Sequence, residues 1–289
     1  MRLLVCGAGG MLGADVARAG ERAGWELLLH TRTALDITDA NAVERAIVDS
    51  RPDAVLNCAA FTDVDGAETR REEAFAVNAD GPLNLARGAA GAGIPLLHLS
   101  TDYVFDGHAP LDAAGDPRPY VESDPTGPRT VYGASKLAGE THVLAASPKN
   151  TVVRTSWLFG LDGKNFVATM LGLAEEREAV QVVTDQLGCP TWTGHLSPAL
   201  LGLLERGVSG LVHLAGAGVV SWNGFAAEIF RQAERECRVE PASTAQMTRP
   251  APRPAYSALA TERTDVIPLP DWREGLAGYL AARAGMTRA

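Results

Sequence analysis

The stretch "RLLVCGAGGMLG", residues 2–13, decides the fold of this chain. Its first five residues predict a strand, and Gly7, Gly10 and Gly13 follow with GxxGxxG spacing at the start of a helical pattern. Glycine permits a tight turn and the close approach of a pyrophosphate, which the free N–H groups of a helix N-terminus would bind. The stretch therefore predicts the first turn of a dinucleotide-binding sheet. A glycine-rich turn without a ligand is the alternative.

The same alternation of strand and helix continues downstream. Apolar runs predict strands at 25–30, 53–59, 95–100 and 150–157, and amphipathic stretches predict helices at 11–23, 39–50, 69–91 and 131–146. The strands are apolar throughout, as in a parallel sheet that helices cover on both faces. The pattern predicts an α/β fold with a doubly wound parallel sheet, the Rossmann arrangement, and a smaller C-terminal lobe.

The alternation of predicted strands and helices becomes less regular after about residue 157, and residues 240–270 are rich in proline. We therefore predict a dinucleotide-binding domain over residues 1–156 and a mainly substrate-binding lobe over residues 157–289. Residues from about 186 to 220 are expected to return to the first domain, because "TGHLSPALLGLLERG" and "GLVHLAG" again read as a helix and a strand.

Composition narrows the possible functions. The net charge of −9 argues against a general nucleic-acid binder, which needs a basic face. No apolar stretch reaches 18 residues, so no membrane span is predicted. The four cysteines are scattered without a CxxC pair, which argues against a zinc site and suits a reducing cytoplasm.

The second predicted strand bears on the choice of dinucleotide. It ends in His30-Thr31-Arg32, without the acidic residue that would hold the ribose 2′-hydroxyl of NAD. Arg32 would suit the 2′-phosphate of NADP, although an exposed loop arginine is an equally good interpretation. NADPH is thus slightly favoured, and NADH stays open. Ala59 and Ala60, after the third strand, either leave room for the cofactor or pack closely.

The segment "VYGASKLAGE", residues 131–140, places Tyr132 and Lys136 four residues apart on one helix face. A free tyrosine has a pKa of ~10, which is too high for efficient proton exchange at neutral pH. A nearby ammonium favours the phenolate and is expected to lower the pKa of Tyr132. The pair predicts a proton donor for an alkoxide that forms when hydride reaches a ketone. The alternative is a partly buried tyrosine beside a solvated lysine.

Thr101 follows the fourth predicted strand, in "LSTDYVFDG" (99–107), at the sheet edge where ligands bind in such folds. Its hydroxyl can hydrogen-bond the reacting carbonyl, or it simply caps the strand. Asp102 and Tyr103 lie beside it and are candidates for substrate contact.

Taken together, the glycine loop, Thr101, Tyr132 and Lys136 resemble the extended short-chain dehydrogenase/reductase family. Motifs along nearly the whole chain resemble, more closely, its branch that reduces the C4 ketone of dTDP-linked 4-keto-6-deoxy sugars. These motifs are "STDYVFDG" (100–107), "VYGASKLAGE" (131–140), "RTSWLFG" (154–160), "NF" (165–166), "DQLGCPT" (185–191) and "RPAYSAL" (253–259).

The resemblance implies an oxidoreductase that converts dTDP-4-dehydro-L-rhamnose to dTDP-L-rhamnose with NADPH or NADH. It makes Tyr132 the proton donor, with Lys136 orienting the ribose and Thr101 polarising the ketone. The residues expected to contact substrate are Thr101, Asp102, Tyr103, Trp157 and Arg253. Motif and resemblance together place these residues at the cofactor: Gly7, Gly10, Met11, Leu12, Gly13, His30, Arg32, Asp36, Ile37, Ala59, Ala60, Thr62, Tyr132 and Lys136.

Some members of this family form a dimer through a metal held by acidic side chains. Asp15 is suitably acidic here, but "PTWTGH" (190–195) has no acid, so we predict no metal and leave monomer or homodimer open. His98, His195 and His213 have no acidic or cysteine partners at ligand spacing and are interpreted as structural.

Other functions remain possible on this fold. A sugar-nucleotide dehydratase typically has an Asp-Glu pair after the threonine, whereas Tyr103 stands here in place of the glutamate. A C4 epimerase is less strongly excluded. A 4-ketoreductase of another dTDP-4-keto-6-deoxy sugar would use the same chemistry. A non-catalytic NADP-binding subunit, resembling the regulatory subunit of methionine adenosyltransferase, is a further alternative, although the complete set of Thr101, Tyr132, Lys136 and Trp157 favours catalysis.

Overall fold

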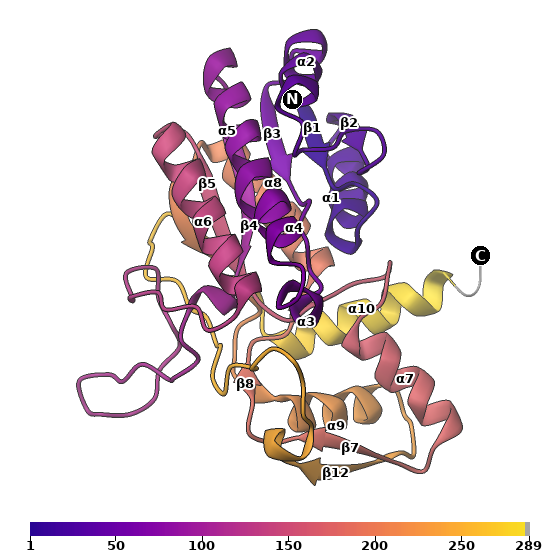
Figure 1. Ribbon diagram of the computed structural model, residues 1–289. Helices are drawn as coiled ribbons and strands as arrows, with labels where there is room; N and C mark the ends of the chain where they lie inside the picture. The colour runs from indigo at the N-terminus through magenta and orange to yellow at the C-terminus, as the bar shows by residue number, and fades with distance from the viewer. Residues whose placement is uncertain (287–289) are drawn as a thin grey trace.

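The computed structural model describes residues 1–286 and has a six-stranded sheet at its centre (Figure 1). Its strands pair in parallel throughout. Their order is β10 (Gly210–His213), β5 (Thr151–Thr155), β4 (Leu96–Thr101), β3 (Ala54–Asn57), β1 (Arg2–Cys6) and β2 (Glu26–His30). The predicted doubly wound parallel sheet is confirmed.

The direction of winding reverses at β1. The chain passes from β1 to β2 on one side and then crosses to β3 on the other. In open α/β sheets, ligands bind in the crevice outside the carboxyl ends of the strands at such a switch point. The glycine loop follows β1 and Ala59 follows β3, so both stand at this crevice.

Helices cover both faces of the sheet, which explains why the strands are apolar throughout. Leu3 and Val5 of β1 pack with α1 (Met11–Arg22) and α8 (Thr193–Arg206) on one face. The intervening Leu4 and Cys6 point to the other face, which is covered by α2 (Ala40–Ser50), α5 (Gly81–Ala92) and α6 (Val131–Ala146).

The helix predicted over 69–91 is broken, so that prediction was wrong as a single element. It consists of α4 (Arg71–Phe75), a π-helical turn η1 (Ala76–Asp80) and α5, and the short α3 (Val64–Ala67) precedes it. Asn78 in the π turn bonds both backbone polar groups of Phe61 and donates to Ser135 Oγ. The π turn thus ties this region to the loop after β3 and to α6, which a local pattern does not reveal.

The C-terminal lobe packs below the sheet around its own apolar core, which includes Phe159, Phe225 and Trp272. Its larger elements are α7 (Phe166–Glu176), β7 (Ala179–Val183), α9 (Trp222–Gln232), β12 (Arg238–Ala242) and α10 (Trp272–Met286), and β7 pairs in parallel with β12. The shorter ones are β6 (Leu158–Phe159), β8 (Leu187–Gly188), β9 (Thr191–Trp192), β11 (Val220–Ser221) and η3 (Thr244–Gln246), whereas the 3-10 turn η2 (Asp102–Val104) directly follows β4 of the sheet.

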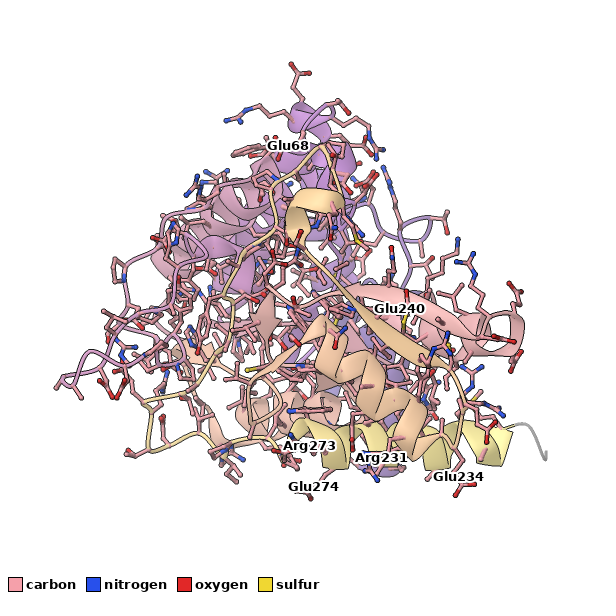
Figure 2. All side chains as sticks on the ribbon, turned by 90° about the horizontal axis from the view of Figure 1, so that it is seen from below. Glu68, Arg231, Glu234, Glu240, Arg273 and Glu274 are labelled. Carbon is pink, nitrogen blue, oxygen red and sulfur yellow. The ribbon has the colours of Figure 1, made fainter. Side chains whose placement is uncertain are left out.

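Charged side chains cover the outside of this lobe. Arg231, Glu234, Arg273 and Glu274 lie at its outer edge in Figure 2. Within residues 1–286, no helix is long and apolar enough to cross a membrane. The domain boundary near residue 156 stays a prediction, and the final residues 287–289 of the predicted lobe lie outside the described residues.

Candidate active site

Two adjoining cavities lie at the carboxyl edge of the sheet. We call the first, of about 750 Å³, the glycine-loop cavity, because Gly7, Gly10 and Gly13 line it. The second, of about 1000 Å³, is the interlobe cavity, lined by the ends of β4 and β5 and by segments of the C-terminal lobe. Five residues line both cavities: Thr62, Ser100, Tyr132, Thr155 and Leu158.

The glycine loop is built so that only small residues fit. Gly7 has φ +78°, in the left-handed region, and a Cβ on Gly13 would lie 2.3 Å from the carbonyl oxygen of Gly7. No side chain caps the N-terminus of α1, which begins directly after Gly10. The backbone N–H groups of the first turn are therefore suited to an anion, and the volume of the cavity suits a dinucleotide with its pyrophosphate there.

Most of the residues predicted for the cofactor line this cavity. They are Gly7, Gly10, Met11, Leu12, Gly13, Arg32, Asp36, Ile37, Ala59, Ala60, Thr62, Tyr132 and Lys136. His30 does not line it. Its carbonyl accepts hydrogen bonds from the N–H groups of Gly7 and Ala8, at 2.9 and 3.0 Å, and so holds the loop.

Two charged side chains of opposite sign stand at the β2 end of the cavity. Arg32 is 75% exposed, and its guanidinium lies 3.9 Å from Glu73. Asp36 accepts hydrogen bonds from the backbone N–H and the hydroxyl of Thr38, which lower the pKa of its carboxyl. Because Asp36 is bonded to Thr38 and the Arg32 side chain is largely exposed, the Arg32 guanidinium is available to an anionic group at this end of the cavity.

Helix α6 carries Tyr132 and Lys136, and its first turn is anchored at two points. Thr130 accepts a hydrogen bond from Gly133 N, and Glu68 accepts one from Val131 N at 2.9 Å. A Cβ on Gly133 would lie 2.1 Å from the carbonyl oxygen of Tyr103. Glycine therefore lets α6 lie directly against the segment that follows β4.

Tyr132 lies at the junction of the two cavities, with its ring edge-on to Tyr103 at a centroid distance of 5.5 Å. Burial raises the pKa of its phenol to about 12, and a hydrogen bond with Thr101 offsets part of that rise. The expectation that Lys136 lowers the Tyr132 pKa is therefore wrong for the protein alone. Desolvation of the phenolate has the largest influence on this pKa, and the nearby Asp102 carboxylate raises it further.

Lys136 is directed into the protein interior. The side chain is 2% exposed, and its Nζ donates to the carbonyl oxygen of Leu99 at 2.5 Å and lies 3.4 Å from His98 Nε2. Burial lowers the pKa of Lys136 to about 8, although Glu140 and Cys58 act in the opposite direction. Lys136 still lines the glycine-loop cavity and is charged for the most part at neutral pH.

Thr101 and Asp102 are coupled by a hydrogen bond beside Tyr132. Thr101 Oγ1 donates to Asp102 Oδ1 at 2.9 Å and accepts from Tyr103 N at 3.2 Å. Asp102 is 4% exposed, and burial raises the pKa of its carboxyl to about 6. The Thr101 hydroxyl is thus fixed beside the phenol, at the end of β4.

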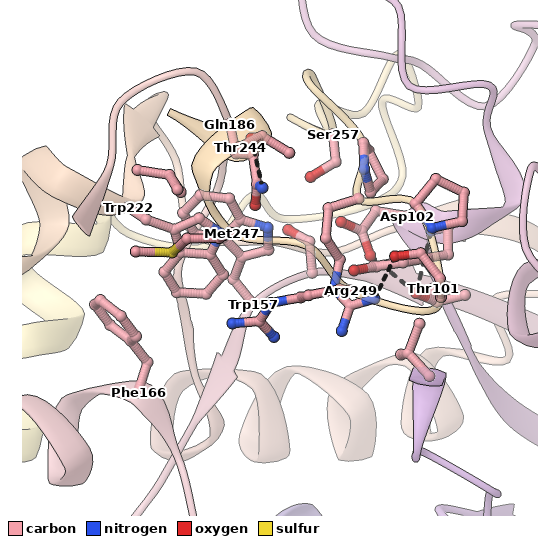
Figure 3. Close-up of a pocket in the computed structure, with 18 of the residues that line it drawn as sticks. Thr101, Asp102, Trp157, Phe166, Gln186, Trp222, Thr244, Met247, Arg249 and Ser257 are labelled. Carbon is pink, nitrogen blue, oxygen red and sulfur yellow. Dashed lines mark hydrogen bonds between the residues drawn. The ribbon is translucent and has the colours of Figure 1, made fainter. Parts of the chain in front are cut away.

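The interlobe cavity is lined by all five residues predicted to contact substrate, namely Thr101, Asp102, Tyr103, Trp157 and Arg253. Trp157 stacks on Trp222, with ring centroids 3.6 Å apart and planes at 5°, and Phe166 contacts Trp222 from the side (Figure 3). Trp157 has φ +46°, and a Cβ on Gly188 would lie 2.4 Å from its ring. Packing from both sides holds this strained backbone.

Two arginines of the proline-rich segment line the same cavity, and one of them is ion-paired whereas the other is exposed. Arg253 is paired with both carboxylate oxygens of Asp65, at 2.9 and 2.8 Å, and so joins the lobe to α3. Arg249 is exposed and makes no ion pair within the described chain. Sequence reasoning missed Arg249 and Trp222, and it included Phe166 in the motif "NF" without assigning it to the site. Arg249 was open to prediction from its place in "TRPAPRP", whereas nothing local marks Trp222.

The described residues, 1–286, contain no group of three or more histidine, cysteine or acidic side chains arranged to hold a metal. Asp15, the one acidic candidate at the predicted family site, accepts hydrogen bonds from Arg18 and Thr193 instead.

Comparisons with known proteins agree with this architecture. A family model described as "RmlD substrate binding domain" matches residues 1–284. The chain is 49% identical over 293 residues to "dTDP-4-dehydrorhamnose reductase" of Mycobacterium tuberculosis H37Rv, covering 99% of this chain and 94% of that one. It is 43% identical to "Probable dTDP-4,6-dihydroxy-2-methyloxan-3-one 4-ketoreductase" of Streptomyces antibioticus, covering 96% and 93%.

A solved dTDP-4-dehydrorhamnose reductase from Bacillus anthracis, in complex with NADP, superimposes with a TM-score of 0.92 at 36% identity. The superposition covers 97% of this chain and 99% of that one. The chain therefore belongs to the family of the dTDP-4-dehydrorhamnose reductases and is an oxidoreductase.

Proposed function

We propose that the protein reduces the C4 ketone of dTDP-4-dehydro-L-rhamnose to dTDP-L-rhamnose with NADPH or NADH, and that Tyr132 is the proton donor. The observation that carries the proposal is the position of Tyr132, whose side chain lines both cavities. A phenol at that junction stands between a dinucleotide in one cavity and a sugar in the other. The family membership supplies the substrate, and the NADP in the Bacillus anthracis relative supports the cofactor.

The glycine-loop cavity is the proposed cofactor site. The first turn of α1 would hold the pyrophosphate, and Ala59 and Ala60 line the same cavity. When bound there, a reduced nicotinamide supplies the hydride that the ketone carbon accepts. Arg32 would bind a 2′-phosphate if NADPH is used, and Lys136 would hold the ribose next to Tyr132.

Tyr132 acts as a general acid in this proposal. With a pKa of about 12 it is protonated at neutral pH and has a proton to give. Negative charge develops on the C4 oxygen, to which the Tyr132 hydroxyl donates, and Thr101 would donate to it as well once its hydrogen turns away from Asp102 Oδ1. Lys136, charged for the most part at pH 7, then stabilises the tyrosinate.

The interlobe cavity is the proposed site for the dTDP-sugar. Asp102, Tyr103 and Trp157 would contact the sugar next to the reacting carbon. Because Asp65 already neutralises Arg253, the exposed Arg249 is the better candidate for the diphosphate. Binding energy from this remote part of the substrate would position the ketone. The proposed compartment is the cytoplasm, and monomer and homodimer both fit the proposal.

The test is to mix the protein with NADPH or NADH and dTDP-4-dehydro-L-rhamnose, follow the absorbance of the reduced nicotinamide, and identify the product by NMR. Oxidation matched by dTDP-L-rhamnose is the expected result. Tight NADPH binding without oxidation would overturn the proposal and point to the regulatory subunit described above.

A second candidate is reduction of another dTDP-linked 4-keto-6-deoxy sugar. The 43% identity to the Streptomyces antibioticus ketoreductase favours it, because that relative acts in name on a different ketosugar. A comparison of kcat/KM for the two ketosugars separates these candidates. If kcat/KM is clearly higher for the second ketosugar, that sugar replaces dTDP-4-dehydro-L-rhamnose as the proposed substrate.

A further inference from the structure

A buried row of three polar side chains lies behind the active-site face of α6. Asn57 at the end of β3 and His98 in β4 are 0% exposed, and Lys136 is 2% exposed. Asn57 Nδ2 lies 3.0 Å from His98 Nδ1, and His98 Nε2 lies 3.4 Å from Lys136 Nζ. Both ring nitrogens of His98 therefore face polar partners.

The orientation of the Asn57 amide fixes the first contact. Its Oδ1 accepts a hydrogen bond from the backbone N–H of Ala59 at 3.0 Å, so its NH₂ group faces the imidazole. An N–H donor there requires a lone pair on His98 Nδ1. Burial holds the pKa of His98 well below its usual value, so the ring is neutral. A neutral ring that accepts at Nδ1 carries its proton on Nε2.

That proton points at Lys136. A nitrogen that carries hydrogen has no lone pair to offer an ammonium, so His98 gives Lys136 no acceptor and favours the uncharged amine. The opposite tautomer would accept from the ammonium and favour its charge. The other groups around Lys136 are Glu140 on α6 and Cys58 after β3, which favour the charged form, and the carbonyl oxygen of Leu99.

We propose that Asn57 and His98 are positioning residues that act through Lys136. Asn57 selects the Nε2–H tautomer of His98, which offers the Lys136 ammonium no acceptor and donates to the amine only after Lys136 has lost its proton. The inference rests on the active-site role of Lys136 proposed above. It revises the sequence-based interpretation of His98 as merely structural. Because Ala59 lines the glycine-loop cavity, the same row connects Lys136 to the proposed cofactor site.

The tautomer can be observed directly. In the full-length protein labelled with ¹⁵N-histidine, NMR distinguishes a protonated ring nitrogen from one with a free lone pair. The His98→Phe variant assigns the resonances by their loss. We expect His98 to be neutral, with the hydrogen on Nε2. A hydrogen on Nδ1, or on both nitrogens, would overturn the proposal whatever reaction the protein catalyses.

Asn57→Asp tests the consequence for catalysis with almost no change of shape. One carboxylate oxygen still accepts from Ala59 N, while the other now accepts from His98 Nδ1–H. The freed Nε2 lone pair then accepts from the Lys136 ammonium, which raises the Lys136 pKa. In the native protein kcat/KM should fall as pH rises past about 8, where Lys136 loses its proton. In the variant this fall should move to higher pH by about one unit.

Two further variants separate the effect of the His98 tautomer on the pH profile from the effect of the added negative charge. In a His98→Phe background, Asn57→Asp should produce no such shift, and a full shift there would refute the relay through His98. Asn150→Asp is the matched control, because Asn150 is 1% exposed and directly precedes β5. It therefore lies at the amino ends of the parallel strands, whereas Asn57 lies at the carboxyl end of β3. Asn150→Asp should leave the pH profile in place. Failure of the proposed reaction itself would appear as no oxidation of NADPH or NADH by the native protein with dTDP-4-dehydro-L-rhamnose, and the NMR result does not depend on that outcome.

Discussion

The two cavities that meet at Tyr132 are built in different ways. The glycine-loop cavity has a wall of bare backbone in the loop after β1, where it is lined by Gly7, Gly10 and Gly13. The interlobe cavity is walled largely by side chains, and its stacked pair, Trp157 and Trp222, comes from segments far apart in the chain. A backbone wall changes only if the fold changes, whereas a side-chain wall depends on each packing partner. We therefore expect substitutions in the glycine-loop cavity to change the affinity for NADPH, and substitutions in the interlobe cavity to change KM for the dTDP-sugar.

Tyr132→Phe should give the largest effect, because it removes the proton donor at the junction of both cavities. General acid catalysis typically contributes about 10²- to 10⁴-fold, and we expect kcat to fall by that order. The Kd for NADPH should change little, since the ring that lines the cavity is kept. Steady-state kinetics with a separate NADPH titration checks both values. A kcat near that of the native protein would remove Tyr132 from the mechanism.

Gly13→Ala should damage the glycine-loop cavity next most strongly. The new Cβ would lie 2.3 Å from Gly7 O, and overpacking of this kind costs about 1–3 kcal/mol. We expect a lower Tm and NADPH binding weakened by about tenfold, since 1.4 kcal/mol corresponds to that factor.

Gly10→Ala is the matched control for that change. Its Cβ would meet the same carbonyl oxygen at 3.3 Å, a contact that a small shift relieves. It should cost clearly less in Tm. Equal losses in the two variants would show that loop flexibility, and not the close approach, limits this wall.

The difference in construction also explains what the sequence could predict. Gly7, Gly10 and Gly13 stand within one short motif, so spacing alone places them at the cavity. Trp157 was recognised only through the resemblance of "RTSWLFG". Trp222, its stacking partner, begins a helix 65 residues later, and no local pattern reports that the two rings meet.

Burial is the other property that spacing did not reveal. Tyr132 and Lys136 were predicted on one helix face, and both line the glycine-loop cavity. The direction of the Tyr132 pKa was nevertheless wrong, because Tyr103 and the end of β4 enclose the phenol. Asn78 likewise looked like an ordinary helical residue, although its bonds to Phe61 belong to a π turn. These features depend on neighbours that only the tertiary fold supplies.

Trp222→Ala tests the side-chain wall. An aromatic pair contributes about 0.5–1.5 kcal/mol beyond area burial, so losing the stack under Trp157 should raise KM for the dTDP-sugar about two- to tenfold. The Kd for NADPH should be unchanged, because Trp222 does not line the glycine-loop cavity. Trp25→Ala, which truncates a tryptophan packed near α1, controls for general destabilisation. If both variants raise KM equally, the stack has no special role.

Arg32→Ala should give the smallest effect and addresses the choice of cofactor. Its side chain is 75% exposed, so water and salt screen its charge, and exposed ion pairs contribute about 0.2–1 kcal/mol. We expect the Kd for NADPH to rise about fivefold or less while that for NADH stays constant, since only NADPH carries the 2′-phosphate. The difference should shrink as salt is added. An equal change for both cofactors would instead show that Arg32 shapes the loop after β2, and that neither dinucleotide is selected at this position.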